Sequence, residues 1–258
     1  MEIKAYLERI DYHGGLEPTA RTLRELHRAH MLAVPFENLD IHLDRPIMLN
    51  DAALFSKIVE RRRGGFCYEM NGLFAALLSG LGFRVDKLAA GVTREGGGFG
   101  PPFDHMTLLV HLEERWLADV GFGESFREPL LLDERGEQMS GGHAYRIKDD
   151  GENLILQRRD ASGAWADQYL FTLRPYEYRD YEEMCRYHQT SPESHFTQRR
   201  VCTRATDEGR ITLSDLRLII TRDGKQEERL LEDEREYDRA LKEYFGVELG
   251  GSTFRART

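Results

Sequence analysis

RRGGFCYEMNG, residues 62–72, is the most informative stretch of this chain, and Cys67 stands at its centre. A glycine pair leads into the cysteine, and an apolar run from Met70 to Leu81 follows it with the composition of a buried helix. We expect the thiol to be exposed at the N-terminus of that helix, where backbone N–H groups and the helix dipole stabilise a thiolate. Three arginines add positive charge beside it: Arg61, Arg62 and Arg63. The segment therefore predicts a thiolate enzyme.

Length and composition describe an ordinary globular protein. The 258 residues are enough to bury a core, and 40% hydrophobic with 31% charged residues argues against disorder. The net charge of −9 argues against general nucleic-acid binding, which depends on cationic surface. Small molecules are the expected partners, and the oligomeric state is left open.

Nothing in the sequence indicates export or a membrane. No apolar run approaches the roughly 20 residues that span a bilayer, and the first 15 residues are charged, without the apolar core of a signal peptide. The three cysteines are widely spaced and odd in number: Cys67, Cys185 and Cys202. We therefore expect free thiols in a reducing cytoplasm.

The first third of the chain has helical periodicity. Helices are expected over residues 18–32, over residues 51–62 and from Cys67 onward, because apolar residues recur there on one face. VPFENLDIHL, residues 34–43, breaks the pattern and is expected to be a loop or an extended segment.

From Phe83 onward the pattern changes to short strands. Alternating or β-branched apolar residues between turn formers predict an antiparallel sheet or barrel. The last third mixes helix and strand and closes with a charged helix, and its acidic and basic run from Lys225 to Arg239 is expected to be solvated surface. Strands are expected at 83–93, 105–113, 115–121, 143–148, 153–158, 165–172, 211–213 and 216–220, with helices near 175–187 and 231–245.

A thiol nucleophile needs a base, and the base needs a group that fixes its tautomer. His105 opens one strand and Asp119 ends the next, so a hairpin would bring both to one end of the sheet, beside the helix of Cys67. Taken singly, each has a structural explanation. Cys67 could be a buried core residue, His105 an edge-strand histidine and Asp119 a turn former.

Together these residues resemble the arylamine N-acetyltransferase family. RRGGFCYEMN is followed by His105 after 38 residues and by Asp119, in DVGFG, after a further 14, which is similar to the spacing of that family's catalytic triad. VPFENLD and SPESHFT resemble its N-terminal and lid motifs, so the similarity runs in four blocks from about residue 16 to about residue 200.

The resemblance implies an α+β fold with a papain-like Cys-His-Asp core. Residues 1–82 would form a helical domain that carries the nucleophile, residues 83–190 a central antiparallel β-barrel, and residues 191–258 a C-terminal α/β lid. The implied activity is transfer of an acetyl group from acetyl-coenzyme A through an acyl-cysteine, in a ping-pong sequence, to arylamines or arylhydrazines.

The resemblance also assigns roles. Cys67 would be the acetyl-accepting nucleophile, His105 its base, and Asp119 the group that orients His105. The other assignments are Phe36, Phe122 and Phe196 as lining of the acceptor pocket, Arg63 and Glu69 as site support through charge pairing, and Gly98, Phe99, Gly100, Pro101 and Pro102 as contacts at the coenzyme A cleft. Without the motifs, the three phenylalanines would be core aromatics, Arg63 a surface residue at a helix end, and Glu69 a first-turn acid.

Other chemistries stay open to different degrees. A related acyltransferase or amide synthase would share the thiol but use another acyl donor or a biosynthetic amine, and a catalytically silent binding module would keep only the fold. A papain-like hydrolase has the same residue order. No metal is expected, because no CxxC or HExxH motif occurs and His27 with His30 lacks a third ligand.

Overall fold

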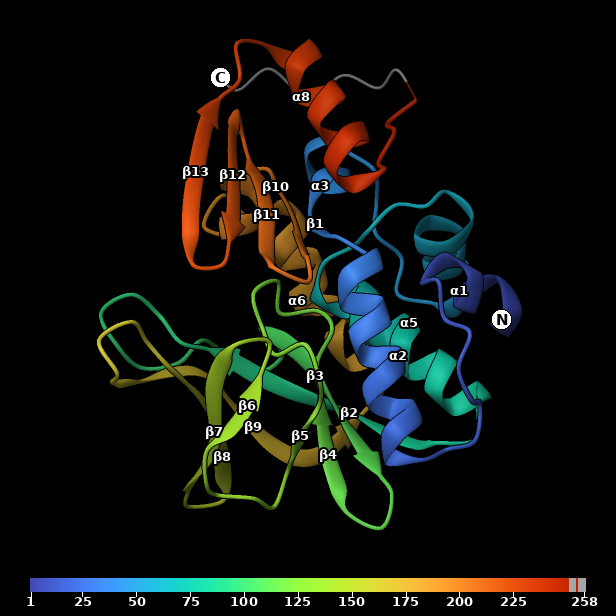
Figure 1. The fold of residues 1–258 in the computed structure, drawn as a ribbon, viewed down its shortest axis with the longest axis vertical. Helices are drawn as coiled ribbons and strands as arrows, with labels where there is room; N and C mark the ends of the chain where they lie inside the picture. The colour runs from blue at the N-terminus through green and yellow to red at the C-terminus, as the bar shows by residue number, and fades with distance from the viewer. Residues whose placement is uncertain (251–253, 255–258) are drawn as a thin grey trace.

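The computed structural model describes residues 1–250 and 254. The protein consists of two antiparallel sheets and a group of N-terminal helices (Figure 1). The predicted α+β architecture is confirmed, with helices first, a barrel-like sheet in the centre and a smaller sheet with helices at the C-terminal end. Domain boundaries at 82/83 and 190/191 remain a prediction, and residues 251–253 and 255–258 of the predicted lid lie outside the described part.

The N-terminal helices follow the expected periodicity. The predicted helix over residues 51–62 is α4, which continues directly into a π-helical turn, η1. Residues 34–43, expected to be a loop or an extended segment, hold the two-residue strand β1, and only the one-turn helix α3 departs from that expectation. The bounds are α1 Ile3–Arg9, α2 Ala20–Ala33, β1 Phe36–Glu37, α3 Leu39–His42, α4 Asp51–Phe55, η1 Ser56–Glu60 and α5 Cys67–Gly80.

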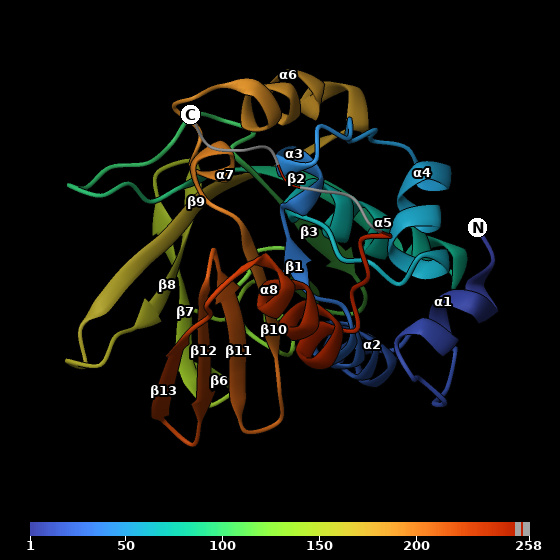
Figure 2. The ribbon, with the colours of Figure 1, turned by 90° about the horizontal axis from the view of Figure 1, so that it is seen from above.

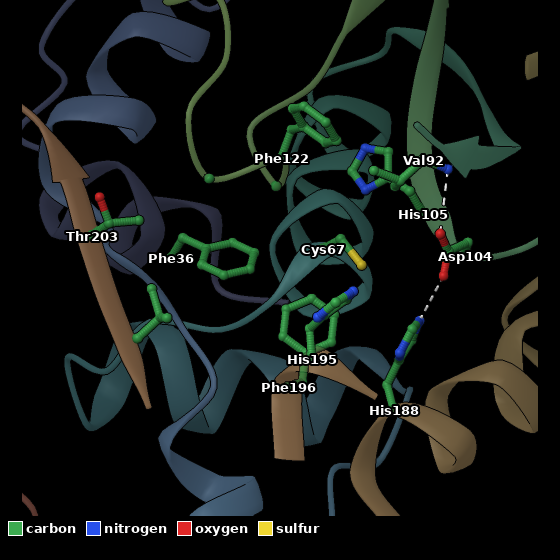
Figure 3. A pocket seen from close by; sticks show the side chains of 13 residues that line it. Phe36, Cys67, Val92, Asp104, His105, Phe122, His188, His195, Phe196 and Thr203 are labelled. Carbon is green, nitrogen blue, oxygen red and sulfur yellow. Dashed lines mark hydrogen bonds and ion pairs between the residues drawn. The ribbon is translucent and has the colours of Figure 1, made fainter. Parts of the chain in front are cut away.

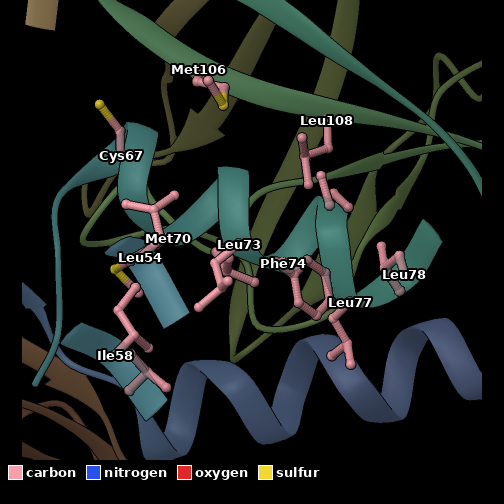
Figure 4. Packing of buried hydrophobic residues seen from close by; sticks show 14 of the residues in the cluster. Leu54, Ile58, Cys67, Met70, Leu73, Phe74, Leu77, Leu78, Met106 and Leu108 are labelled. Carbon is pink, nitrogen blue, oxygen red and sulfur yellow. The ribbon is translucent and has the colours of Figure 1, made fainter. Parts of the chain in front are cut away.

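Helix α5 is the central helix of the core (Figure 4). It is apolar on almost every side, which is the pattern of a buried helix rather than an amphipathic one. Leu73 and Phe74 of α5 are fully buried, together with Met106 of strand β3 (His105–His111) and Leu54 of α4. The first residue of α5, Cys67, is therefore held by a rigid element.

The larger sheet has eight strands in the order β5-β4-β3-β2-β9-β8-β7-β6, all antiparallel. Its two edge strands meet, because the Gln138 side chain of β6 exchanges hydrogen bonds with the Leu131 backbone of β5 (2.8 and 2.9 Å). The sheet thus curls into a barrel-like form (Figure 1). Its strands are β2 Arg84–Val92, β3 His105–His111, β4 Arg115–Ala118, β5 Leu130–Leu131, β6 Gln138–Ser140, β7 His143–Asp150, β8 Asn153–Arg159 and β9 Trp165–Tyr176.

The second sheet joins the N-terminal and C-terminal parts of the chain. Its order is β1-β10-β11-β12-β13, so a strand from the N-terminal segment is completed by four C-terminal strands. The charged run from Lys225 to Arg239 is largely exposed, as expected, and forms the edge strand β13 and the start of α8. Figure 2 shows α6 and α7 next to the N-terminal helices. The elements are α6 Tyr178–Thr190, α7 His195–Gln198, β10 Val201–Ala205, β11 Gly209–Ser214, β12 Arg217–Arg222, β13 Lys225–Leu230, α8 Glu234–Ala240 and η2 Leu241–Phe245.

Candidate active site

Cys67 is the first residue of α5, directly after the helix cap. The Glu69 carboxylate accepts a hydrogen bond from the Phe66 backbone N–H (3.1 Å) and so ties the helix start down. Gly64 is required for a steric reason. A Cβ there would lie 1.9 Å from the Pro35 carbonyl oxygen, so only glycine lets this segment run beside β1.

His105 and Asp119 come together as the predicted hairpin requires. The Nε2 atom of His105, at the start of β3, lies 2.7 Å from Oδ2 of Asp119, which follows β4. Both residues are buried. Gly121 lets this end of the hairpin reach Cys67, because a Cβ there would lie 2.9 Å from the Cys67 Cα.

The surroundings of Asp119 favour its ionised form. Its second oxygen, Oδ1, accepts hydrogen bonds from the Asn71 amide (2.9 Å) and from the Gly121 backbone N–H (3.0 Å). Burial raises the pKa of Asp119, but the charge of His105 and these hydrogen bonds outweigh it and hold the pKa below its usual value. A carboxylate in this state fixes the tautomer of His105 and stabilises an imidazolium.

His27, one of the two histidines without a third metal ligand, forms a hydrogen bond with the backbone of Asp119. Its Nε2 accepts the backbone N–H of Asp119 (3.1 Å), and its Nδ1 lies 2.9 Å from the Arg127 carbonyl oxygen. A backbone N–H can only donate and a carbonyl can only accept, so the proton sits on Nδ1. Burial lowers the pKa of His27 to about 4, which keeps the ring neutral.

A cavity of about 380 Å³ opens above these groups (Figure 3). Cys67 and His105 line it, together with all three phenylalanines assigned to the acceptor pocket, Phe36, Phe122 and Phe196. The ring of Phe122 meets that of His105 edge-on at 5.0 Å, and Phe196 lies between Phe36 (6.1 Å) and Phe66 (5.6 Å). Since about 150 Å³ holds benzene, this cavity has room for a substituted aromatic ring.

The expectation of an exposed thiol is wrong. Cys67 is 3% exposed and lines the cavity. Burial raises the pKa of its thiol well above the usual value, while a backbone hydrogen bond from Met106 opposes that rise. Burial therefore works against the stabilisation of a thiolate by the helix start.

Contrary to the expectation, the three arginines do not place free positive charge beside the thiol. Arg61 and Arg62 are exposed, whereas Arg63 is buried and bound by Glu37 (2.7 Å) and Asp40 (3.0 Å). The positive charge of Arg63 is thus neutralised by carboxylates rather than offered to Cys67.

Arg63 and Glu69 belong to one buried cluster of charges, through Lys57. The Lys57 ammonium lies 2.9 Å from Glu69 Oε1 and 2.9 Å from Asp40 Oδ2. With Glu37, the cluster contains three carboxylates and two cations. It fixes the N-terminal turn of α5 against β1, α3 and η1, and its members other than Arg63 and Glu69 were not foreseen from the sequence.

The loop assigned to coenzyme A does not line this cavity. It is linked to the rim, because the Gly100 backbone N–H donates to the Val92 carbonyl oxygen (2.7 Å) and Val92 lines the cavity. The other assigned residues of the loop are Gly98, Phe99, Pro101 and Pro102.

Asn71 is the main residue of the site that the sequence did not reveal. Besides Asp119, its amide donates to the Met106 carbonyl (2.6 Å), and its oxygen accepts the Val120 backbone N–H (2.9 Å). The available signal was its place on the helix face of Cys67, four residues later.

A cysteine at a helix start, beside a His–Asp pair on a barrel-like sheet, defines the class of enzymes with a papain-like Cys-His-Asp core. A family model described as N-acetyltransferase matches residues 19–254. The chain is 38% identical to an arylamine N-acetyltransferase / N-hydroxyarylamine O-acetyltransferase of Salmonella typhimurium, over 83% of this chain and 76% of that protein. This chain belongs to the arylamine N-acetyltransferase family.

Two further similarities bear on the chemistry. The structure of Mycobacterium marinum arylamine N-acetyltransferase in complex with CoA superposes with a TM-score of 0.91 and 34% identity, covering 98% of this chain and 95% of that one. Proansamycin X synthase of Amycolatopsis mediterranei is 31% identical over 93% of this chain and 95% of its own length.

The helices of the described part contain no segment long and apolar enough to cross a membrane.

Proposed function

We propose that this protein transfers an acetyl group from acetyl-coenzyme A to arylamines or arylhydrazines through an acetyl-Cys67 intermediate. The observation that carries the proposal is the arrangement of Cys67 and His105 in the wall of one apolar cavity, with Asp119 on the far nitrogen of His105. The complex of the M. marinum relative with CoA supports the acyl donor.

In the first half-reaction, the Cys67 Sγ–H proton moves to His105. Asp119 holds Nε2, so Nδ1 is the nitrogen that receives it. The sulfur attacks the thioester carbonyl carbon, and the tetrahedral intermediate collapses with cleavage of the bond to the coenzyme A sulfur. That sulfur takes the proton from His105, leaving acetyl-Cys67 and free coenzyme A.

In the second half-reaction, an arylamine nitrogen attacks the acetyl-Cys67 carbonyl and gives a proton to His105. Collapse of this intermediate forms the amide, breaks the C–S bond and returns the proton to Cys67. Phe36, Phe122 and Phe196 would hold the aromatic ring and keep water from the acyl-cysteine. Arg63 and Glu69 would act indirectly by fixing the start of α5, and Gly98 to Pro102 would contact coenzyme A at the rim.

Intact-protein mass spectrometry tests the intermediate. Mixing with acetyl-coenzyme A should add one acetyl group to the wild type and none to Cys67→Ala, while Cys185→Ala, which removes a different buried thiol, should still be acetylated. A wild type that stays unmodified would refute the acetyltransferase proposal. Rapid hydrolysis of peptides without accumulation of an acyl-enzyme would instead identify a hydrolase.

A second candidate is favoured by the similarity to proansamycin X synthase. A related amide synthase would use the same thiol with another acyl donor or a tethered biosynthetic amine. A screen of acyl thioesters against aniline and hydrazide acceptors separates the two, since turnover with a larger acyl donor but not with acetyl-coenzyme A indicates the synthase.

We also propose that the protein works in the cytoplasm. All three cysteines of the chain are unpaired and buried, and thiols of this kind persist in a reducing compartment.

A further inference from the structure

The cavity wall holds a second histidine–carboxylate pair that the proposed reaction does not use. His188, on α6, and Asp104, directly before β3, both line the cavity (Figure 3). The His188 Nε2 atom lies 3.3 Å from Asp104 Oδ1. In Figure 3 this pair lies on the opposite side of Cys67 from Phe36.

Both members of the pair are held in place. Asp104 Oδ2 accepts the Val92 backbone N–H (3.3 Å), and the preceding carbonyl, of Phe103, accepts the Tyr68 hydroxyl (2.6 Å). His188 Nδ1 shares a hydrogen bond with Ser194 Oγ (3.1 Å). The His188 ring also packs edge-on against Phe196, with ring centroids 5.0 Å apart.

The His188 Nε2 atom is buried and makes no hydrogen bond within the described residues, although Asp104 Oδ1 is close. His188 is 5% exposed. When Nδ1 donates to Ser194, Nε2 is an acceptor that faces a second acceptor, the Asp104 carboxylate. A ligand group with two or more N–H donors satisfies both atoms at once, and a buried polar atom without a partner is costly.

Charge favours the same kind of ligand. The residues that line the cavity include the Asp104 carboxylate and neither lysine nor arginine. A positively charged group of an acceptor therefore meets a carboxylate in an apolar surrounding, where attraction is stronger than in water. A negatively charged substituent meets like charge.

We propose that Asp104 and His188 form an acceptor subsite that selects arylamines carrying a second, cationic N–H donor group and disfavours anionic arylamines. This subsite rests on the proposed function, since it assigns the substrate class of the same cavity. Asp104 and His188 determine specificity, and the reacting groups remain Cys67 and His105.

Competition between acceptors tests the subsite. 3- and 4-(Aminomethyl)aniline carry an alkylammonium at neutral pH, 4-aminobenzoate carries a carboxylate, and 4-methylaniline is neutral. All react with the same acetyl-enzyme, so ratios of kcat/KM report only the acceptor step. Asp104→Asn should lower the cation-to-anion ratio roughly tenfold or more relative to wild type. His188→Leu should lower the ratio for the cationic over the neutral amine.

The matched control is Asp86→Asn, which alters another Asp–His pair (Asp86 with His111, 2.7 Å) outside the cavity and should leave every ratio unchanged. Calorimetry with Cys67→Ala tests binding without turnover, and the cationic amines should bind roughly tenfold tighter than 4-methylaniline. Equal binding, or ratios that Asp104→Asn and His188→Leu leave unchanged, would overturn the subsite. Absence of acetyl-Cys67 would overturn the proposed function, while the calorimetry still decides the subsite.

Discussion

At the scale of single residues, Asn71 connects the helix of Cys67 to both strands of the His–Asp pair. One amide contacts Asp119, the Met106 carbonyl and the Val120 N–H, at distances between 2.6 and 2.9 Å. These three contacts set how the two strands and the helix approach each other. Asn71 is therefore a positioning residue whose effect reaches the thiol through Asp119 and His105.

Asn71→Ala tests this role. The variant removes three buried hydrogen bonds, so the free energy of unfolding should fall by about 3 kcal/mol. The pKa of Asp119 should rise, because a hydrogen bond to its charged form is lost. Asp119 must be ionised, so the acid limb of the rate of Cys67 acetylation should move to higher pH, measured by rapid-mixing mass spectrometry.

The control for this variant is Asn153→Ala, in the β7–β8 hairpin, which should keep the wild-type pH profile. An Asn71→Ala variant that is less stable but has an unchanged acid limb would show a purely structural role.

At the scale of elements, the β3–β4 hairpin explains how the sequence pattern led to the site. Leu108 pairs with Ala118, and extending this antiparallel register sets Thr107 opposite Asp119 and His105 opposite Gly121. His105 and Asp119 are then diagonal neighbours, within reach of long side chains. Short hairpins have local register, so this part of the site was predictable.

The connection between the first and last segments is a second feature at this scale. The Asn38 amide, after β1, donates to the Phe196 and Arg199 carbonyls (2.9 and 2.7 Å), and its oxygen accepts the Val201 N–H (2.8 Å). It therefore holds the α7–β10 connection, which carries Phe196, against the N-terminal segment.

Asn38→Ala should release that wall of the cavity. We expect KM for an arylamine to rise several-fold, with a smaller effect on the acetylation of Cys67, and the free energy of unfolding to fall by about 2 kcal/mol. Steady-state kinetics and urea titration measure these changes. Asn50→Ala, which removes the cap of α4 (2.9 Å to Ala53 N), is the matched control and should lose stability without a change in KM. An unaltered KM in Asn38→Ala would contradict the proposed coupling.

At the scale of the whole molecule, a buried cluster of charges joins the N-terminal elements β1, α3, η1 and α5. Glu37, Asp40 and Glu69 share Lys57 and Arg63, so three carboxylates face two cations. Attraction from the carboxylates outweighs burial and raises the pKa of Lys57. Burial raises the pKa of Glu69 to about 7 against the attraction of Lys57, so Glu69 is the carboxylate that takes up a proton.

This assignment predicts a pH dependence of stability. The folded protein binds a proton at Glu69 that the unfolded chain releases above its ordinary pKa of 4.5, so the contribution of Glu69 falls as pH rises from about 4.5 to 7. Glu69→Gln cannot titrate. The free energy of unfolding of wild type minus that of the variant should therefore fall by about 3 kcal/mol across this window, in urea titrations from pH 4.5 to 8.

Glu152→Gln, at an exposed turn, is the control, and its difference from wild type should stay flat. A flat difference for Glu69→Gln as well would show that Glu69 remains ionised throughout.

The sequence by itself determined the fold class, the helix of Cys67 and the pairing of His105 with Asp119. These depend on local periodicity, on a hairpin and on motifs that resemble one family. Only the tertiary structure decided the burial of the Cys67 thiol, the neutralisation of Arg63, the role of Asn71 and the Asp104–His188 pair. Each of these depends on groups brought together from distant parts of the chain, and packing, not spacing, sets the dielectric environment and the hydrogen-bond partners there.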